Sequence, residues 1–542
     1  MKMDFRGLEL HGRRMWERRR ILEALDFIAR YDMTALVLHE TDLVHNLVYP
    51  RHYFDPYALW KSAPSRRGEN AIQNNRVYFE HILDLAGNRG VDVWVEVKEL
   101  GFPDEVLEAR PQLIIDGHIC PSDPFWFEFT EQKTSELVDD FPKLAGMIVS
   151  AGSPEGRASL VQRKCACTRC RSLSVEEWYR QLILALHRPL ARRGKRLAVR
   201  EFAYKPADHE VLLRAIDGLP TDIIVCIKNT PHDFYPTFPD NPAIGRLDRT
   251  QWVEYETYGQ FYGMGVVPCF LYDDVRTRLE HATRHGVTGA LFRVEWERIN
   301  DWWALETLNE MNLVAAAMFS RGDALIPEEV CRLWLANKGW PGECASWLSD
   351  VLLQTWPIVR GALYIDGFLF ADSSFLPRSI RRAWWTMEEK HCIADWDASK
   401  RGALELDRGR VVALIAEKED SRLRLTALAA QIRAGHPALP RLLAEDLLRQ
   451  TEVFEAYVEG FYHCAVVCLY HRWMERRPDE IQDTDRTRME TALQQLADYG
   501  ARRRAAAKEA RHPHVVYLLM DYHRVEDIVA EGRQAFTAAA TA

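Results

Sequence analysis

The chain has 542 residues, of which 47% are hydrophobic and 27% charged, a composition typical of a soluble globular protein with two or three domains. Its formal net charge of −9 gives no reason to expect nucleic acid or an anionic membrane as a partner. The sequence shows neither a secretory signal nor an apolar run of membrane-spanning length, and 11 scattered cysteines fit reduced thiols, so we expect a cytoplasmic protein.

In the first 300 or so residues, short β-rich runs alternate with amphipathic helical patterns. The predicted strands cover residues 5–10, 35–39, 91–97, 145–152, 195–202, 222–228, 251–259 together with 265–271, and 289–296. Strands that alternate with helices indicate a parallel sheet, and about eight repeats favour a closed barrel over an open sheet. We therefore predict a (β/α)₈ barrel over residues 1–325.

Beyond residue 325 the pattern changes to long helices, so residues 326–542 are predicted to form an all-α C-terminal domain. The segment at its start that is rich in Trp and Tyr, residues 334–385, is expected to pack against the barrel. Within this segment, residues 363–375 (LYIDGFLFADSSF) interrupt the helical periodicity of apolar residues. We interpret them as an ordered loop that reaches toward the barrel mouth.

Barrel enzymes take their catalytic groups from the carboxyl ends of several strands. The candidate side chains at or just beyond these ends are His39, Glu155, Arg200, Lys228, Asp233, Glu254, Glu256, Gln260, Arg293, Glu295 and Trp303. Carboxylates, arginines and aromatic rings together suit a sugar, and a pair of acids suits glycosidic cleavage. Alternative interpretations remain open here: solvated loop acids, a hydrogen-bonded barrel-rim role for His39, and core packing for Trp303.

Four segments at the strand ends of the predicted barrel resemble, in order and spacing, motifs of the family 67 α-glucuronidases. They are residues 145–157 (AGMIVSAGSPEGR), 197–204 (LAVREFAY), 224–234 (IVCIKNTPHDF) and 252–263 (WVEYETYGQFYG). The resemblance covers roughly residues 80–340. It implies that Glu155 is the general acid and Asp233 one of two water-activating carboxylates, with Arg200 and Lys228 matching a conserved arginine and lysine of the family's motifs.

The chain departs from the family at three points. The second water-activating glutamate falls on Gln260, so Glu254 or Glu256 is expected to serve in its place. The lysine that precedes the acid in the family falls near Ser150 or Ala151, and the N-terminal β-sandwich of the family has no counterpart. A homodimer is expected from the resemblance alone.

We therefore predict a glycoside hydrolase that removes a terminal sugar, with an α-linked uronic acid as the leading choice, from a short oligosaccharide. Glu155 is assigned as the acid and Asp233 as the base, assisted by Glu256 or Glu254, with no cofactor needed for catalysis. Arg200, Lys228, Gln260, Arg293, Glu295, His39 and Trp303 are the candidate sugar contacts. The alternatives are a hydrolase of a different, neutral glycoside and a non-catalytic carbohydrate-binding relative.

A separate signal is the run KCACTRC, which places Cys165, Cys167 and Cys170 within six residues. Three thiols at this spacing resemble half of a zinc site, and Cys120 or a histidine would supply the fourth ligand. We predict a structural zinc ion that clips the long loop after the fourth barrel strand. Free thiols without a metal are the alternative.

Overall fold

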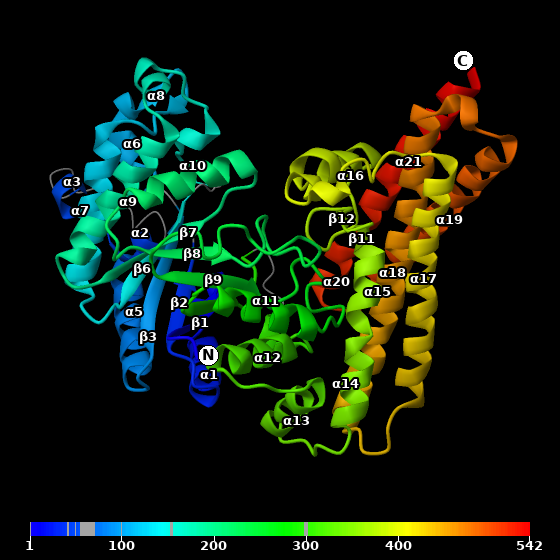
Figure 1. Ribbon diagram of the computed structural model, residues 1–542, viewed down its shortest axis with the longest axis horizontal. Coiled ribbons are helices and arrows are strands. Elements are labelled where there is room, and N and C mark those ends of the chain that lie inside the picture. Colours follow the sequence, from blue (N-terminus) through cyan, green and yellow to red (C-terminus); the bar gives the residue numbers. More distant parts are fainter. Residues whose placement is uncertain are drawn as a thin grey trace.

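The computed structural model describes residues 2–40, 43–48, 50–54, 71–98, 100–151, 156–297 and 302–541. Two parts lie side by side (Figure 1): a barrel formed by the first half of the chain and a bundle of long helices formed by the second. The predicted fold class, a (β/α)₈ barrel followed by an all-α domain, is confirmed.

The barrel contains eight parallel strands that close on themselves in the order β1-β10-β9-β8-β7-β6-β3-β2. They are β1 (Phe5–Leu10), β2 (Ala35–His39), β3 (Asp92–Lys98), β6 (Gly146–Ala151), β7 (Arg196–Glu201), β8 (Ile224–Lys228), β9 (Gln251–Glu256) and β10 (Gly289–Arg293). Each coincides with a predicted strand. The further stretch predicted as strand, residues 265–271, forms turns and irregular chain instead, because it begins at a glycine with φ +68° and contains Pro268.

Helices cover the outside of the barrel between successive strands. They are α1 (Arg18–Arg30), α2 (Leu43–Leu47), α3 (Arg51–Phe54), α5 (Ala71–Gly87), α6 (Glu105–Ala109), α7 (Pro124–Asp140), α8 (Thr168–Ser172), α9 (Val175–Ala191), α10 (Pro206–Asp217), α11 (Tyr272–Arg284) and α12 (Glu310–Arg321). A short hairpin, β4 (Ile114–Ile115) with β5 (His118–Ile119), precedes α7. Between β8 and β9, residues 229–250 form turns and bends in place of a helix, which leaves this connection free to shape the barrel mouth.

The barrel interior near the amino ends of the strands is filled by aromatic rings. Phe5 stacks on Trp252 with ring centroids 3.6 Å apart, and Trp94 meets both rings edge-on. Glycine makes room for them: a Cβ at Gly289 would lie 2.3 Å from the Trp252 ring, and one at Gly146 would lie 2.5 Å from Trp94. The closed end of the barrel therefore depends on these two glycines.

We predict that Gly289→Ala destabilises the protein by about 1–3 kcal/mol, because the new methyl group overlaps the packed indole of Trp252. Urea denaturation followed by circular dichroism measures this loss. The matched control is Gly87→Ala at the end of α5, where an added Cβ meets nothing within 4 Å. Equal midpoints for the two variants would contradict the packing argument.

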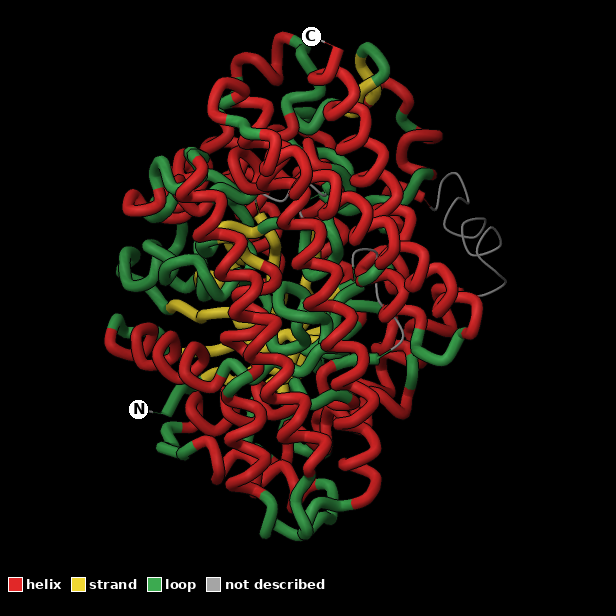
Figure 2. Tube along the Cα trace, turned by 90° about the vertical axis from the view of Figure 1, so that its right-hand side faces the viewer, coloured by secondary structure: helices red, strands yellow, loops and turns green. Residues whose placement is uncertain are grey.

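The second half of the chain is mainly helical, as predicted. Its helices are α13 (Pro327–Asn337), α14 (Ala345–Leu353), α15 (Thr355–Leu363), α16 (Ile380–Trp385), α17 (Arg408–Ala434), α18 (Arg441–Arg476), α19 (Asp483–Glu509), α20 (His514–Leu519) and α21 (Tyr522–Thr541). The three longest, α17 to α19, are the long patterns seen in the sequence. In Figure 2 the long bundle helices lie in front of the barrel strands. None of the helices formed by the described residues combines the length and apolar character needed to cross a membrane.

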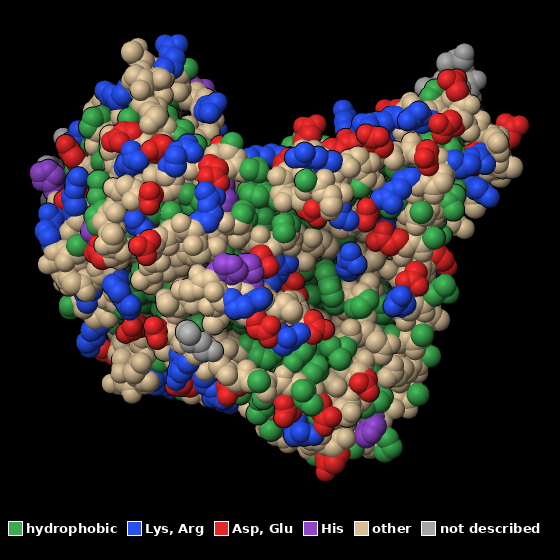
Figure 3. Space-filling model, viewed as in Figure 1, with side chains coloured by type: hydrophobic (Ala, Val, Ile, Leu, Met, Phe, Trp, Pro, Cys, Tyr) green, Lys and Arg blue, Asp and Glu red, His purple; other side chains and the backbone are tan. Residues whose placement is uncertain are grey.

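The loop predicted to reach the barrel mouth does so. It begins with the hairpin β11 (Tyr364–Ile365) and β12 (Phe368–Leu369). The Tyr364 hydroxyl donates to the Phe261 carbonyl at 2.8 Å, and Ser374 Oγ donates to the Gln260 carbonyl at 2.9 Å while it accepts from the Gly263 N–H at 2.8 Å. The helical domain is thus fixed to the loop after β9. The space-filling view in Figure 3 shows a surface hollowed along its upper edge, between the barrel lobe that bears α8 and α10 and the arm of the bundle.

Candidate active site

Above the aromatic layer, the barrel interior holds a layer of charged side chains. The Arg200 guanidinium on β7 makes two hydrogen bonds to the Glu254 carboxylate on β9, one of them at 2.8 Å, and lies 3.5 Å from Glu96 on β3. Ser150 Oγ on β6 donates to Glu96 at 2.6 Å and accepts from Arg200 at 3.2 Å. All four side chains are buried, so they form a closed network inside the barrel.

This network continues toward β1 and β2. Nδ1 of His39 lies 2.9 Å from the Glu9 carboxylate and 3.4 Å from Glu96, and Nδ1 of His11 lies 2.7 Å from Glu9. Burial is the main reason that the pKa of His39 lies well below its usual value, and the nearby His11 is the next. His39, Arg200 and Glu254, which the sequence placed in the site, therefore lie in the barrel interior beneath the mouth.

The pKa of Glu96 is raised to about 8, chiefly by burial; Arg200 opposes this rise, and Glu9 and Glu254 contribute to it. The folded protein thus holds this proton more tightly than the unfolded chain. The resulting stabilisation is complete below the usual pKa of 4.5 and is lost as the pH rises through about 8.

We therefore predict that Glu96→Gln, which keeps a neutral side chain of the same shape, reduces the fall in stability between about pH 5 and pH 8.5. Urea midpoints measured across this range test it. Glu80→Gln, at an exposed position of α5, is the control and should keep the slope of the unmodified protein. The same slope in Glu96→Gln would refute the assignment.

At the carboxyl end of β8, a buried lysine holds an aspartate at the mouth. Lys228 Nζ donates to Asp233 Oδ1 at 3.2 Å and lies 3.9 Å from the centroid of the Phe202 ring. Asp233 adopts φ +46°, and its carbonyl accepts from Thr230 Oγ1 at 2.6 Å, which closes a tight turn. Burial alone would raise the pKa of Asp233, but Lys228 and the two nearby histidines outweigh it and lower that pKa to about 2. Asp233 is therefore a carboxylate at neutral pH.

Asp233 lines a pocket of about 240 Å³ between the barrel mouth and the helical domain. The barrel contributes Tyr204, Asp233, Tyr235, Gln260, Phe261, Trp296 and Glu297, and the helical domain contributes Asp372, Ser373, Phe375, Arg378, Arg382, Lys390, His391 and Arg524. Trp296 and Phe375 face each other across the two domains with ring centroids 6.0 Å apart. The pocket thus joins an aromatic wall, carboxylates and four cationic side chains.

The cationic side of the pocket comes from three parts of the helical domain. Arg378 precedes α16, and Arg382 belongs to it. Lys390 ends a π-helical turn, Thr386–Lys390, and Arg524 is part of α21. Lys390 pairs with Asp372 at 2.7 Å and Arg382 lies 3.5 Å from the same carboxylate. Burial and the neighbouring Arg378 lower the pKa of Arg524, and both side chains line the pocket.

Two histidines connect the turn that contains Asp233 to the cationic side of the pocket. Nδ1 of His232 lies 3.0 Å from the Tyr204 carbonyl, its Nε2 lies 2.5 Å from Nδ1 of His391, and Nε2 of His391 lies 3.0 Å from Asp372. Together with Asp233, the two rings could hold a metal ion, since one ligand atom of each lies within 4.8 Å of the others. Burial lowers the pKa of both histidines.

The remaining predicted contacts lie at or just beneath the pocket. Gln260 lines it and accepts from Arg293 at 2.9 Å, whereas Glu295 pairs with Arg14 at 2.7 Å. Both oxygens of Glu256 accept backbone N–H groups of the following turn, from Gly259 at 2.7 Å and Gln260 at 3.1 Å. Burial raises the pKa of Glu256 to about 7. Glu256 therefore shapes the turn that presents Gln260.

Of the predicted site residues that the structure describes, Asp233 and Gln260 line the pocket, and the others lie beneath it or elsewhere in the core. Trp303 is completely buried in the core, so its ring presents no face to a ligand. The general acid predicted from sequence, Glu155, lies outside the described residues. Sequence reasoning missed Asp372, Trp296 and the arginines of the helical domain. Trp296 stands in a predicted strand end, and Asp372 belongs to the loop predicted to reach the mouth, but no sequence pattern identifies Arg378, Arg382 or Arg524 as lining the pocket.

The fold and the pocket define a (β/α)₈-barrel protein with a polar pocket between the carboxyl ends of its strands and a helical domain. No protein-family model and no curated protein sequence matches the chain. Its fold is similar to that of a GH138 enzyme targeting pectin rhamnogalacturonan II, with a TM-score of 0.62, 13% identity and coverage of 92% of this chain. The chain spans 63% of the length of that structure.

Two other solved structures align with lower TM-scores. An O-GlcNAc hydrolase of Thermobaculum terrenum aligns over 99% of this chain and 95% of its own length, with 12% identity and a TM-score of 0.45. CpGH84B aligns over 98% and 77%, with 13% identity and a TM-score of 0.43. At 13% identity, the similarity to the GH138 enzyme shows a shared fold and no more.

Proposed function

We propose that the protein is a glycoside hydrolase that binds one terminal sugar in the pocket between its two domains. The observation that carries this proposal is Asp233, an ionised carboxylate held by Lys228 at the carboxyl end of a barrel strand and facing the pocket. The volume of about 240 Å³ is smaller than the roughly 300–1,000 Å³ of typical drug-sized sites, which favours a single sugar unit. Trp296 and Phe375 offer apolar surfaces for its ring.

Glycoside hydrolysis needs one protonated and one ionised carboxyl group. The carboxylates that line the described part of the pocket are Asp233, Glu297 and Asp372. Burial opposes the ionised form of each, yet neighbouring cations and histidines lower all three pKa values. None of these three therefore suits the general acid at neutral pH, and we assign that role to Glu155, whose sequence motif resembles the family 67 acid.

In this assignment, Glu155 protonates the departing glycosidic oxygen. Asp233 then takes a proton from the attacking water, or attacks the anomeric carbon itself. Lys228 keeps Asp233 ionised by a charge-assisted hydrogen bond at 3.2 Å. Glu254 and Glu256, the predicted assistants, are occupied by Arg200 and by the backbone of the turn. They would act by holding the strand end in place.

The narrower proposal is that the sugar is an α-linked uronic acid. Burial and Arg378 disfavour the charged form of Arg524, and an anionic ligand in the pocket would offset that effect. Guanidinium groups also bind carboxylates through paired hydrogen bonds. In the family 67 motifs, the uronate contact is a lysine that precedes the acid. Here Arg378 and Arg524 belong to the helical domain, so that domain would supply the uronate contact.

We predict that Asp233→Asn lowers kcat by about 10²–10⁴-fold on whichever glycoside the protein cleaves, because the base is lost. The assay uses a panel of nitrophenyl α- and β-glycosides, including glucuronides, together with short aldouronic oligosaccharides. Asp248→Asn, at an exposed position of the same β8–β9 connection, is the control and should retain full turnover. Equal turnover by Asp233→Asn at an unchanged melting temperature would refute the catalytic role.

We also predict that Arg378→Gln raises KM for an anionic glycoside about tenfold or more, since a lost charged hydrogen bond contributes about 1.5–3 kcal/mol, while KM for a neutral glycoside changes little. Arg381→Gln is the matched control, since Arg381 is the exposed neighbour of Arg382 and does not line the described pocket. Equal effects on both substrates would favour the alternative, a hydrolase of neutral glycosides. Binding of sugars without turnover of any of them would favour a non-catalytic relative.

A further inference from the structure

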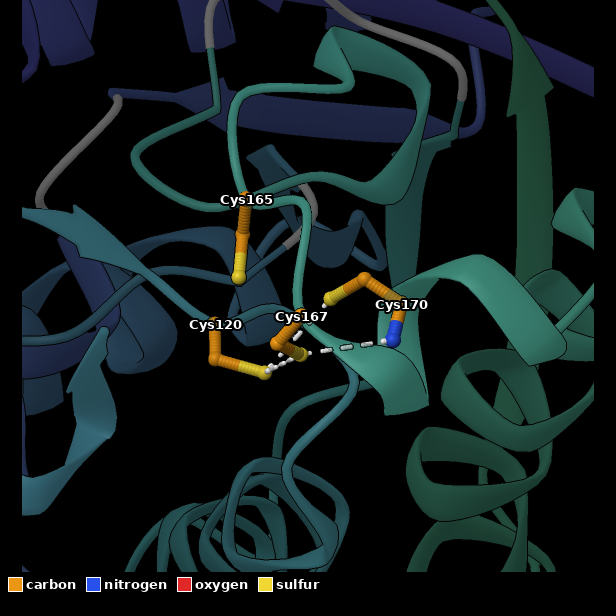
Figure 4. A group of neighbouring side chains, drawn as sticks. All are labelled: Cys120, Cys165, Cys167 and Cys170. Carbon is orange, nitrogen blue, oxygen red and sulfur yellow. Dashed lines mark hydrogen bonds between the residues drawn. The ribbon is translucent and has the colours of Figure 1, made fainter. Parts of the chain in front are cut away.

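Four cysteines meet at one point outside the candidate active site (Figure 4). Cys120 stands between the β4–β5 hairpin and α7, whereas Cys165, Cys167 and Cys170 belong to the loop after β6 and to α8. Their four sulfur atoms all lie within 4.8 Å of one another, and Figure 4 shows the side chains directed toward a common centre. The structure therefore joins Cys120 to a cluster that lies about 45 residues further along the chain.

The spacing of the sulfur atoms matches a metal site better than a disulfide. Cys120 Sγ lies 3.6 Å from Cys167 Sγ and 3.5 Å from Cys170 Sγ. Zinc–sulfur bonds of about 2.3 Å in a tetrahedron place the sulfurs about 3.8 Å apart. A disulfide requires about 2.05 Å, and all four cysteines are free.

The surroundings hold these ligands in place. The Cys120 carbonyl accepts from the Trp126 indole at 2.9 Å, and its N–H donates to the Leu113 carbonyl at 2.9 Å. The Cys170 N–H donates to Cys167 Sγ at 3.4 Å, an interaction that stabilises a thiolate. Basic residues at positions 163, 164, 169 and 171 alternate with the cysteines and offset the negative charge of four thiolates.

We propose that Cys120, Cys165, Cys167 and Cys170 bind one structural Zn²⁺ ion. Four protein ligands close the coordination sphere, which is typical of a structural site and leaves no open position for catalysis. The ion would tie the loop after β3 to the loop after β6. The same two loops already meet through a β-bridge between Leu100 and Ala158 and through a 2.6 Å hydrogen bond from Arg157 to the Phe102 carbonyl.

Metal analysis of the purified, desalted protein tests the proposal directly and needs no variant. We expect about one zinc ion per chain. Replacing zinc by Co²⁺ should produce intense visible bands of tetrahedral cobalt and thiolate-to-metal charge-transfer bands in the near ultraviolet. A protein without zinc that takes up no Co²⁺, one with a disulfide among these cysteines, or one that carries iron instead would overturn the assignment.

Variants locate the ion. Cys167→Ser and Cys170→Ser should each lose most of the bound zinc and lower the melting temperature, and a strong chelator should lower the melting temperature of the unmodified protein to a similar value. Cys392→Ser, at another half-buried cysteine, should keep both the zinc and the stability. Full zinc content in both cluster variants would contradict the proposal. Because these readouts do not involve turnover, they are independent of the proposed hydrolase activity.

Discussion

The structure depends on a buried ionic layer inside the barrel, in which Arg200 is held by Glu254 and Glu96. Barrel interiors are usually filled by branched apolar side chains, and this layer replaces them near the carboxyl ends of the strands. Charges buried in this way are stable only when they are paired, because removing one partner typically costs about 3–5 kcal/mol. The layer therefore ties β3, β7 and β9 to one another just beneath the pocket.

The charged layer also explains why Lys228 contacts Asp233 at the barrel mouth. Lys228 on β8 pairs in register with Glu254 on β9, yet its ammonium group turns toward Asp233 because Arg200 already occupies the Glu254 carboxylate. Lys228 holds Asp233 from below, and His232 and His391 connect the Asp233 turn to the helical domain. Support from two sides suits the proposed general acid–base role of Asp233.

The helical domain completes the site. Residues 364–391 fold back over the loop after β9 and bring Asp372, Phe375 and the cationic side chains to the barrel mouth. A barrel alone would offer an open, carboxylate-rich end. Together the two domains enclose a pocket lined by aromatic rings and positive charge, so the proposed selectivity would be a property of the domain interface.

The sequence by itself determined the barrel, its eight strands, the long helices, and the position of Asp233 and Lys228 at a strand end, because the periodicity of apolar residues and the termination of buried strands are local properties. It also indicated three of the four cysteines as one cluster. The tertiary structure decided which charges became interior pairs, since Glu96, Arg200 and Glu254 lie far apart in the chain and only barrel closure brings them together. It likewise placed Arg378 and Arg524 in the same pocket as Asp233, and it selected Cys120, not a histidine, as the neighbour of Cys167, because contacts between distant segments leave no periodic signal in the sequence.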